Sequence, residues 1–301
     1  MARKRRADRD AVHGIVLVNK PKGLTSNGVL QRVMRLLNAQ KGGHTGALDP
    51  FATGLLPICL GEATKVSGLL LDSDKRYIAT LALGTATTTG DLEGDVILEK
   101  PVPELTADRL NQVFQQFLGA GEQVPPMFSA LKHQGKPLYE YARQGIEIER
   151  PARPIYIDAL HLLKVEGNQV QFEVHCSKGT YVRTLGEDIA KALNTVGHLV
   201  ALHRTQTGVF TEEGARSLKQ LEQALEAQAS PLLPIDAALT QYEALRLDEA
   251  QVAWIRQGGM LKLPKPQTEY VRLYDPQGVI VALGEWHEKS EQLKAKRVFQ
   301  Y

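Results

Sequence analysis

The sequence has few cysteines and lacks the short motifs that usually mark nucleotide or zinc sites. Only two of its 301 residues are cysteine, Cys59 and Cys176, and each lies in an apolar segment without C-x-x-C spacing. Isolated thiols of this kind fit a reducing compartment and argue against a disulfide framework. No G-x-x-x-x-G-K-S/T, G-x-G-x-x-G or H-E-x-x-H pattern occurs, so triphosphate, dinucleotide and protease-type zinc sites lose their usual support. His198 and His203 are five residues apart in a predicted turn and strand, and we do not expect them to bind a metal.

Long hydrophobic runs are also absent. No stretch of about 18 apolar residues occurs, which is the length that a membrane helix needs. The basic start, Ala2 to Arg6, is followed only by the short apolar run Gly14 to Val18, which is too short for the core of a signal peptide. We therefore expect a cytoplasmic protein without a membrane partner. Residues 1–11 are predicted to form a disordered basic arm, which serves either solubility or contact with phosphates.

The chain has little excess charge of either sign. Its 36 Lys and Arg residues face 34 Asp and Glu residues, and the net charge is +2. An anionic partner would therefore have to meet a local basic patch, and total charge neither supports nor excludes nucleic acid. With 33.2 kDa and 43% hydrophobic residues, the chain can form one large domain, or one large and one small domain.

The most informative stretch is Gly42 to Pro57, which holds four glycines, two prolines and a single carboxylate, Asp49. Such a composition predicts an irregular loop held in a defined shape. Pro50 disfavours the helical region for Asp49, so its side chain should project from the loop. Taken alone, the Asp-Pro pair is more often a turn former than a nucleophile. The aliphatic segment Leu55 to Leu60 and His44 on the same loop favour a perturbed, functional carboxyl group.

Periodicity predicts alternating strands and helices along the chain. Helices are expected from a cap at Thr25 or Ser26 and over 106–118, 185–194 and 217–227, and strands over 14–18, 76–83, 155–165, 169–176 and 199–210. The threonine-rich run Gly84 to Gly94 is interpreted as a surface loop. A change of composition near Ser230 predicts a domain boundary, followed by a small β-rich module with a helix from Asp248 and strands over 270–274, 279–283 and 297–299.

Basic and aromatic residues alternate between Lys132 and Arg153. This combination suits RNA. Without other evidence, however, the alternation of basic and aromatic residues is better explained by a short solvated helix from Pro137 to Gln144 that ends at Gly145.

Five segments, in this order, closely resemble the bacterial tRNA pseudouridine synthase B family. They are Asn19–Ser26, Gly43–Pro50, Lys75–Tyr77, Lys178–Leu185 and Leu202–Thr205. The resemblance spans nearly the whole chain and implies an α+β fold. Residues 12–240 would form a catalytic domain on a mixed, mainly antiparallel sheet flanked by helices, with an insertion at about 125–153. Residues 241–301 would form a small β-rich, PUA-like RNA-binding domain.

The activity implied by the resemblance is the isomerisation of a uridine in the T-arm loop of tRNA, at position 55, to pseudouridine. No metal, nucleotide or organic cofactor, guide RNA or protein partner would be needed, and we expect a monomer. The target base must leave its stack. In this setting the basic insertion is interpreted as a clamp on the RNA, which reverses its interpretation in isolation.

The resemblance also assigns residues. Asp49 would be the catalytic acid, attacking either the ribose or the base, and Arg183 would pair with it and keep it ionised. Tyr77 would stack on the target base and help to remove the C5 proton. Further substrate-binding or supporting residues would be His44, Lys20, Tyr181 and Leu202. His203 precedes Arg204 where the family often has two arginines, which puts one phosphate contact in doubt.

Two other functions compete with this one. A non-catalytic RNA-binding or RNA-folding protein could use the same cleft, but it would not need Asp49, Tyr77 and Arg183 together. A guide-RNA-dependent pseudouridine synthase is the other alternative, which the small C-terminal module and the absence of basic tails disfavour.

Overall fold

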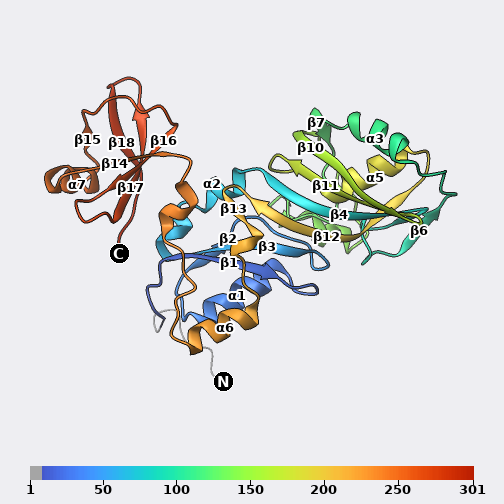
Figure 1. Cartoon of the computed structure of the whole chain (residues 1–301), viewed down its shortest axis with the longest axis horizontal. Coiled ribbons are helices and arrows are strands. Elements are labelled where there is room, and N and C mark those ends of the chain that lie inside the picture. Colours follow the sequence, from blue (N-terminus) through green and yellow to red (C-terminus); the bar gives the residue numbers. More distant parts are fainter. Residues whose placement is uncertain (1–8) are drawn as a thin grey trace.

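The computed structural model describes residues 9–301 (Figure 1). Most of the predicted N-terminal arm therefore lies outside the described residues. Within them, the Asp10 amide donates to the Asn38 carbonyl at 2.8 Å, so the arm, predicted to reach residue 11, ends earlier. No helix in this part of the chain is long and apolar enough to cross a bilayer.

A nine-stranded sheet forms the body of the molecule, in the order β1-β3-β12-β4-β11-β10-β7 with β2 on β3 and β13 on β12. Its main strands are β1 (Gly14–Lys20), β3 (Thr53–Leu60), β4 (Lys75–Leu83), β7 (Gly119–Gln123), β10 (Arg153–Glu166), β11 (Gln169–Cys176) and β12 (Gly197–Thr207). The short ones are β2 (Gly42–His44) and β13 (Phe210–Thr211). Only the β3–β12 pair is parallel. The prediction of a mixed, mainly antiparallel sheet in an α+β fold is confirmed.

Helices cover the sheet in two groups (Figure 1). Helices α1 (Ser26–Leu36) and α6 (Leu218–Glu226) lie beside β1 and β3, whereas α3 (Ala107–Gln115) and α5 (Val182–Ala192) lie against the other half. Helix α1 begins where predicted, because the Thr25 side chain accepts from the Gly28 amide and so satisfies a free amide of the first turn. Its apolar stripe, which includes Val29 and Val33, packs into a core cluster with β1 and β3.

Short elements connect these groups. They are the single turns η2 (Gly61–Lys65), η3 (Glu212–Gly214) and η4 (Ile235–Leu239), helix α2 (Ser67–Asp72) and the hairpin of β5 (Thr85–Thr87) with β6 (Val96–Glu99). The run Gly84 to Gly94 was expected to be a surface loop. That prediction is wrong in part, because Asp91 in this run is only 3% exposed and points inward.

The predicted insertion at about 125–153 contains a small hairpin and one short helix. Strands β8 (Lys132–His133) and β9 (Lys136–Pro137) are followed by α4 (Leu138–Ala142). Both turn residues of the hairpin, Gln134 and Gly135, have positive φ, 49° and 84°, as a type I′ turn requires. The predicted short helix is confirmed. A cation–π contact forms on this helix, in which Lys136 Nζ lies 4.7 Å from the Tyr141 ring centroid.

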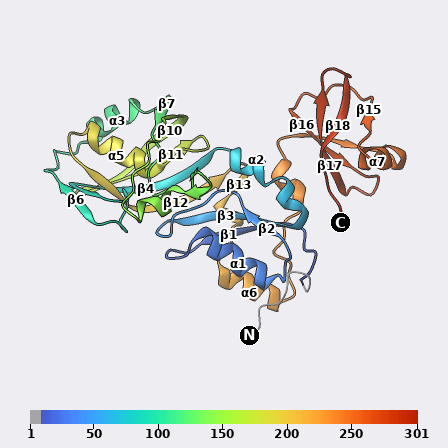
Figure 2. The same cartoon turned by 180° about the vertical axis from the view of Figure 1, so that it is seen from behind.

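The C-terminal part forms its own five-stranded sheet, in the order β14-β16-β17-β18-β15. Its elements are β14 (Glu243–Arg246), α7 (Glu249–Arg256), β15 (Met260–Leu261), β16 (Tyr270–Tyr274), β17 (Ile280–His287) and β18 (Gln292–Val298). The predicted β-rich domain is confirmed, with two short strands more than the sequence pattern indicated. Figures 1 and 2 show this sheet to one side of the molecule, next to η4 and α2. Ile280, Leu283 and Phe299 share an apolar cluster with Ile15 and Leu17 of β1.

Candidate active site

One pocket of about 570 Å³ collects most of the residues singled out in the sequence. It lies between the loop that precedes β3, the start of β4, the end of β12, the start of α5 and the base of the insertion. Six of the seven predicted residues line it: His44, Asp49, Tyr77, Tyr181, Arg183 and Leu202. The seventh, Lys20, lies behind the loop and is fully buried. The structure thus brings together side chains from segments far apart in the chain.

Buried side chains from β1 and α1 fix the backbone on both sides of Asp49. The Ser26 hydroxyl accepts from the Leu48 amide at 2.8 Å and donates to the Leu48 carbonyl at 3.1 Å. On the other side, Lys20 Nζ donates to the Pro50 carbonyl at 3.2 Å. Because a buried polar group without a partner costs free energy, these contacts hold the loop in one conformation. Lys20 therefore supports the loop and does not line the pocket.

Glycine is required where this loop meets strand β12. Gly54 has φ +100°, and a Cβ there would lie 2.4 Å from the Arg204 carbonyl oxygen. No other residue fits so close an approach. Gly54 pairs directly with Arg204 in the parallel β3–β12 contact. The loop is thereby anchored to the centre of the sheet.

Arg183 connects three segments at the wall of the pocket. Its Nε forms an ion pair with Asp49 Oδ2 at 2.9 Å without hydrogen-bond geometry, and its Nη2 donates a long hydrogen bond to Asp49 Oδ1 at 3.5 Å. Its Nη1 donates to the Thr89 carbonyl at 2.7 Å, and its Nη2 donates to the Phe128 carbonyl at 2.6 Å. The side chain is only 4% exposed. The guanidinium orientation is therefore set by protein contacts before any substrate binds.

Sequence reasoning missed Asp91, which also contacts Arg183. Asp91 Oδ2 lies 3.5 Å from Arg183 Nη1. Its Oδ1 accepts from the Thr89 hydroxyl at 2.6 Å and from the Glu93 amide at 3.0 Å. Arg183 therefore lies between two carboxylates, Asp49 and Asp91. The only sequence signal was an acid within a threonine-rich run, which is also typical of a surface turn.

Opposing effects act on the Asp49 carboxyl group. Burial raises its pKa above the ordinary value of 3.8, Asp91 adds to the rise, and Arg183 and Lys20 oppose it. The net direction is upward, whereas pairing with Arg183 was expected to dominate. The side chain keeps 37% of its surface exposed, so water reaches the carboxyl group in the free protein. Arg183 thus moderates a rise in pKa that burial would otherwise make larger.

The other pocket residues supply a largely neutral surface. Burial raises the pKa of the Tyr77 phenol, which therefore keeps its proton at neutral pH and suits stacking better than proton abstraction. Burial lowers the pKa of His44, and its Nδ1 is buried without a hydrogen-bond partner among residues 9–301. The Tyr181 backbone is held by the Gln123 amide, which accepts from its nitrogen at 2.7 Å and donates to its carbonyl at 3.1 Å.

A second residue that sequence reasoning missed is Arg204, which lines the pocket although it is only 1% exposed. Its Nε donates to the Leu55 carbonyl at 2.7 Å, and its Nη2 donates to the Gly46 carbonyl at 3.1 Å. Arg204 and Leu202 both occupy buried positions of β12. A charged residue at an inward-facing position of an alternating strand was the signal that could have identified it.

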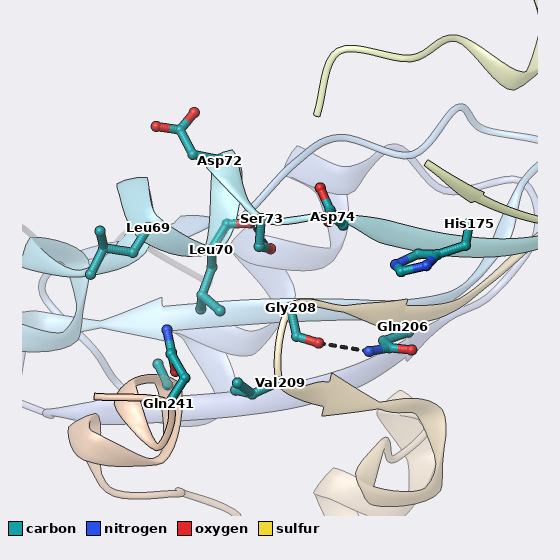
Figure 3. A pocket seen from close by; sticks show the side chains of 11 residues that line it. Leu69, Leu70, Asp72, Ser73, Asp74, His175, Gln206, Gly208, Val209 and Gln241 are labelled. Carbon is teal, nitrogen blue, oxygen red and sulfur yellow. Dashed lines mark hydrogen bonds between the residues drawn. The ribbon is translucent and has the colours of Figure 1, made fainter. Parts of the chain in front are cut away.

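Another pocket, of about 450 Å³, lies apart from these residues (Figure 3). It is bounded by the end of α2, the β12–β13 turn and Gln241, and its polar lining includes Asp72, Asp74 and His175. None of the predicted site residues lines it. Across residues 9–301 there is no group of three or more His, Cys, Asp or Glu side chains arranged to hold a metal ion.

Comparison with known protein families gives two adjoining matches. Residues 34–182 match the N-terminal domain of the TruB family pseudouridylate synthases. Residues 183–240 match the C-terminal domain of tRNA pseudouridylate synthase B. The two segments together cover more than half of the chain and include Asp49, Tyr77, Arg183 and Leu202.

Curated relatives match over nearly their whole length. The tRNA pseudouridine synthase B of Hydrogenovibrio crunogenus is 59% identical over 288 residues, which cover 96% of this chain and 94% of the relative. The protein of the same name from Nitrosococcus oceani is 48% identical, with 91% of both chains covered. That from Aeromonas salmonicida is 46% identical and covers 100% of this chain and 98% of its own.

Solved structures agree on the fold. A Cbf5-Nop10-Gar1 complex contains a chain that superposes with a TM-score of 0.74 at 25% identity, covering 96% of this chain and 85% of that one. A chain of an H/ACA ribonucleoprotein bound to a substrate RNA superposes with a TM-score of 0.72 at 24% identity, covering 96% and 86%. The family matches and the long, close relatives show that the chain belongs to the TruB family of tRNA pseudouridylate synthases.

Proposed function

We propose that the protein converts the uridine at position 55, in the T-arm loop of tRNA, to pseudouridine, acting as a monomer and without a guide RNA. The observation that carries this proposal is the convergence of Asp49, Tyr77 and Arg183 on one pocket. The near full-length relatives, which are all named tRNA pseudouridine synthase B, support tRNA as the substrate.

The reaction needs a carboxylate in a pocket from which water is excluded. The bond between C1′ and N1 breaks, the uracil turns, and a bond forms between C5 and C1′. Asp49 acts on the ribose or on the base. Arg183, held by the Thr89 and Phe128 carbonyls, aims the Asp49 carboxylate and balances its charge once the nucleotide has displaced water from it.

The flipped base is held between side chains of the two central strands. Tyr77 of β4 and Leu202 of β12 both line the pocket, and their neighbouring strands are paired. In our proposal the uracil stacks on the Tyr77 ring, with Leu202 packing beside it. His44, neutral because burial lowers its pKa, fills or braces the gap that the base leaves in the RNA. Tyr181 supports the opposite wall.

Two parts of the chain are suited to hold the RNA outside the pocket. The insertion at about 125–153 carries exposed cations, including Lys132 and Arg143, and its base reaches the site through Phe128. The β-rich domain, proposed to span residues 241–301 and to be PUA-like, offers a second surface. We propose residues 12–240 as the catalytic domain and the cytoplasm as the site of action.

A guide-RNA-dependent synthase is the second candidate, because the Cbf5 chains share the fold. Sequence identity favours the stand-alone enzyme, since Cbf5 is 25% identical and the Hydrogenovibrio relative is 59% identical.

The direct test is to incubate the purified protein alone with unmodified tRNA and to map pseudouridine by a chemical method specific for it. We expect product at the T-loop uridine only. Product that forms only after a guide RNA is added would favour the second candidate, and binding without product would favour a non-catalytic RNA-binding protein.

The matched variant is Asp49→Asn. We expect it to form no pseudouridine while its tRNA affinity stays within about threefold, because the change removes the reacting charge and keeps the side-chain shape. Conversion at the parental rate would show that Asp49 is not the catalytic acid.

A further inference from the structure

Arg204 is a buried cation without a matching carboxylate. No Asp or Glu oxygen within residues 9–301 lies within 4.0 Å of its guanidinium. Two of its N–H groups donate to the main-chain carbonyls of Leu55 and Gly46, and the guanidinium also lies within hydrogen-bonding reach of the Tyr77 phenol. A buried charge that lacks a counterion is costly. Its presence in a pocket lining therefore needs an explanation beyond packing.

The Arg204 guanidinium reaches the pocket. A Cβ placed on Gly46 would lie 3.5 Å from its Nη1, and the Tyr77 phenol lies within hydrogen-bonding reach of the guanidinium. Gly46, Tyr77 and Leu202 line the same pocket. Residue 204 also pairs directly with residue 77 across the β12–β4 contact. Because directly opposed residues on antiparallel strands project to the same face, Arg204 lies beside the ring on which the base is proposed to stack.

A second cation adds to the positive charge at this end of the pocket. Lys75 is 6% exposed and donates to the Leu70 carbonyl at the end of α2 at 3.2 Å. The same hypothetical Gly46 Cβ would lie 4.0 Å from Lys75 Cε. At the other end, Arg183 faces the two carboxylates of Asp49 and Asp91. The pocket thus has carboxylates at the Arg183 end and a cation without a paired carboxylate at the Arg204 end.

We propose that Arg204 donates to a carbonyl oxygen of the flipped uracil and stabilises the negative charge that forms on the base during the reaction. The proposal rests on the function proposed above and assigns a second catalytic contact. A phosphate of the RNA is the less suitable ligand, because a guanidinium that is 1% exposed lies deep in the site, where the base enters. The strongly hydrated phosphates stay near the mouth.

The electron balance explains why a donor is useful there. When the C1′–N1 bond breaks, its electron pair stays with the base and spreads over N1, O2 and O4. When the turned base bonds through C5 to C1′, that charge returns to the new bond. The C5 proton passes to solvent and N1 takes a proton from solvent, so the product is an isomer and no oxidant or reductant takes part. A donor fixed before the reaction lowers the barrier to the charged state.

The test is a double-mutant cycle in which one change is made in the Arg204 side chain and the other in an oxygen of the target base. Arg204→Met and wild type are compared on tRNAs that carry uridine, 2-thiouridine or 4-thiouridine at the target position, because sulfur accepts hydrogen bonds poorly. Single-turnover rates are followed by tritium release from C5, and tRNA affinity is measured separately. Arg76→Met is the matched control, since Arg76 pairs with Glu173 and does not line the pocket.

We expect Arg204→Met to be slower by on the order of 100-fold on uridine, with affinity within about threefold and Arg76→Met unchanged. On one of the two thio substrates, Arg204→Met should be slower than wild type by less than about tenfold, because sulfur has already weakened the hydrogen bond from Arg204 to the base. That substrate identifies the oxygen.

Equal slowing on all three substrates would show that Arg204 only holds the loop, and weaker affinity with a normal rate would assign it to a phosphate. Either result overturns the proposal. If Arg204→Met does not fold, Arg204→Lys, which keeps a charge and a donor, is taken through the same cycle. A wild-type protein that makes no pseudouridine on uridine tRNA would instead refute the function proposed above.

Discussion

Replacing Ser26 by alanine should loosen the loop that carries Asp49. Ser26 is only 3% exposed. Its hydroxyl accepts a hydrogen bond from the Leu48 N–H at 2.8 Å and donates one to the Leu48 C=O at 3.1 Å. Alanine would leave a buried N–H and a buried C=O without partners. Each such group costs about 1 to 3 kcal/mol, so we expect the free energy of unfolding to fall by about 2 to 6 kcal/mol. Because Leu48 precedes Asp49, the turnover rate should fall by about tenfold or more.

Thr25→Ala is the matched control, one residue earlier in the chain. The Thr25 side chain caps the same helix by accepting from the Gly28 amide at 3.0 Å, and its loss should cost about 1 kcal/mol. Among the described residues, its side chain makes no hydrogen bond to the loop, so its turnover rate should equal that of wild type. Urea unfolding gives the stabilities and single-turnover kinetics give the rates. A Ser26→Ala variant that loses no more stability than Thr25→Ala and keeps the parental rate would refute the reasoning.

Three further predictions follow from charges at and near the site. The single-turnover rate should fall on acidification through a pKa above 3.8, since burial raises the pKa of Asp49; a rate that is level down to pH 4 would contradict this. Burial lowers the pKa of Lys20 from 10.5 to about 8. Between about pH 8 and pH 10.5 the Lys20 amine is therefore protonated in the unfolded chain and neutral in the folded one. The free energy of unfolding should rise by about 3 kcal/mol as the pH increases through this range. Urea unfolding of Lys20→Met should lack that gain, and an equal gain would show that Lys20 titrates normally. Binding of tRNA should weaken steeply with salt, and Lys132→Met and Arg143→Met should each reduce the slope by about 0.7 to 0.9 if each cation meets one phosphate; an unchanged slope would exclude those contacts.

Many of the helices and strands could be predicted from local sequence patterns. The strand predicted over 169–176 has the same bounds in the structure, because strict alternation leaves one face to bury. The start of helix α1 was also predicted, with its cap at Thr25 or Ser26; the structure has the cap at Thr25, whose side chain acts within one turn. The strands β14 and β15 were missed because four and two residues are too few to show a period.

The site was only partly predictable, since its supporting contacts join distant residues. Ser26 and Leu48 are 22 residues apart, and Arg204 and Gly46 are 158 apart. Asp91 has the composition of a turn and was taken for one. Nothing local in the sequence indicates that a polar side chain will meet a particular backbone group, so Ser26, Asp91 and Arg204 needed the folded chain.

The contacts of Arg183 also constrain when the site can form during folding. Its partners at Asp49, Thr89 and Phe128 are 134, 94 and 55 residues away in the chain. Closing loops of this size is slow compared with forming a helix or hairpin. Until all three loops have closed, the guanidinium lacks acceptors and the carboxyl group lacks its partner. A nascent or partly folded chain therefore lacks the Asp49–Arg183 pair, and under the function proposed above only molecules that have finished folding would convert uridine.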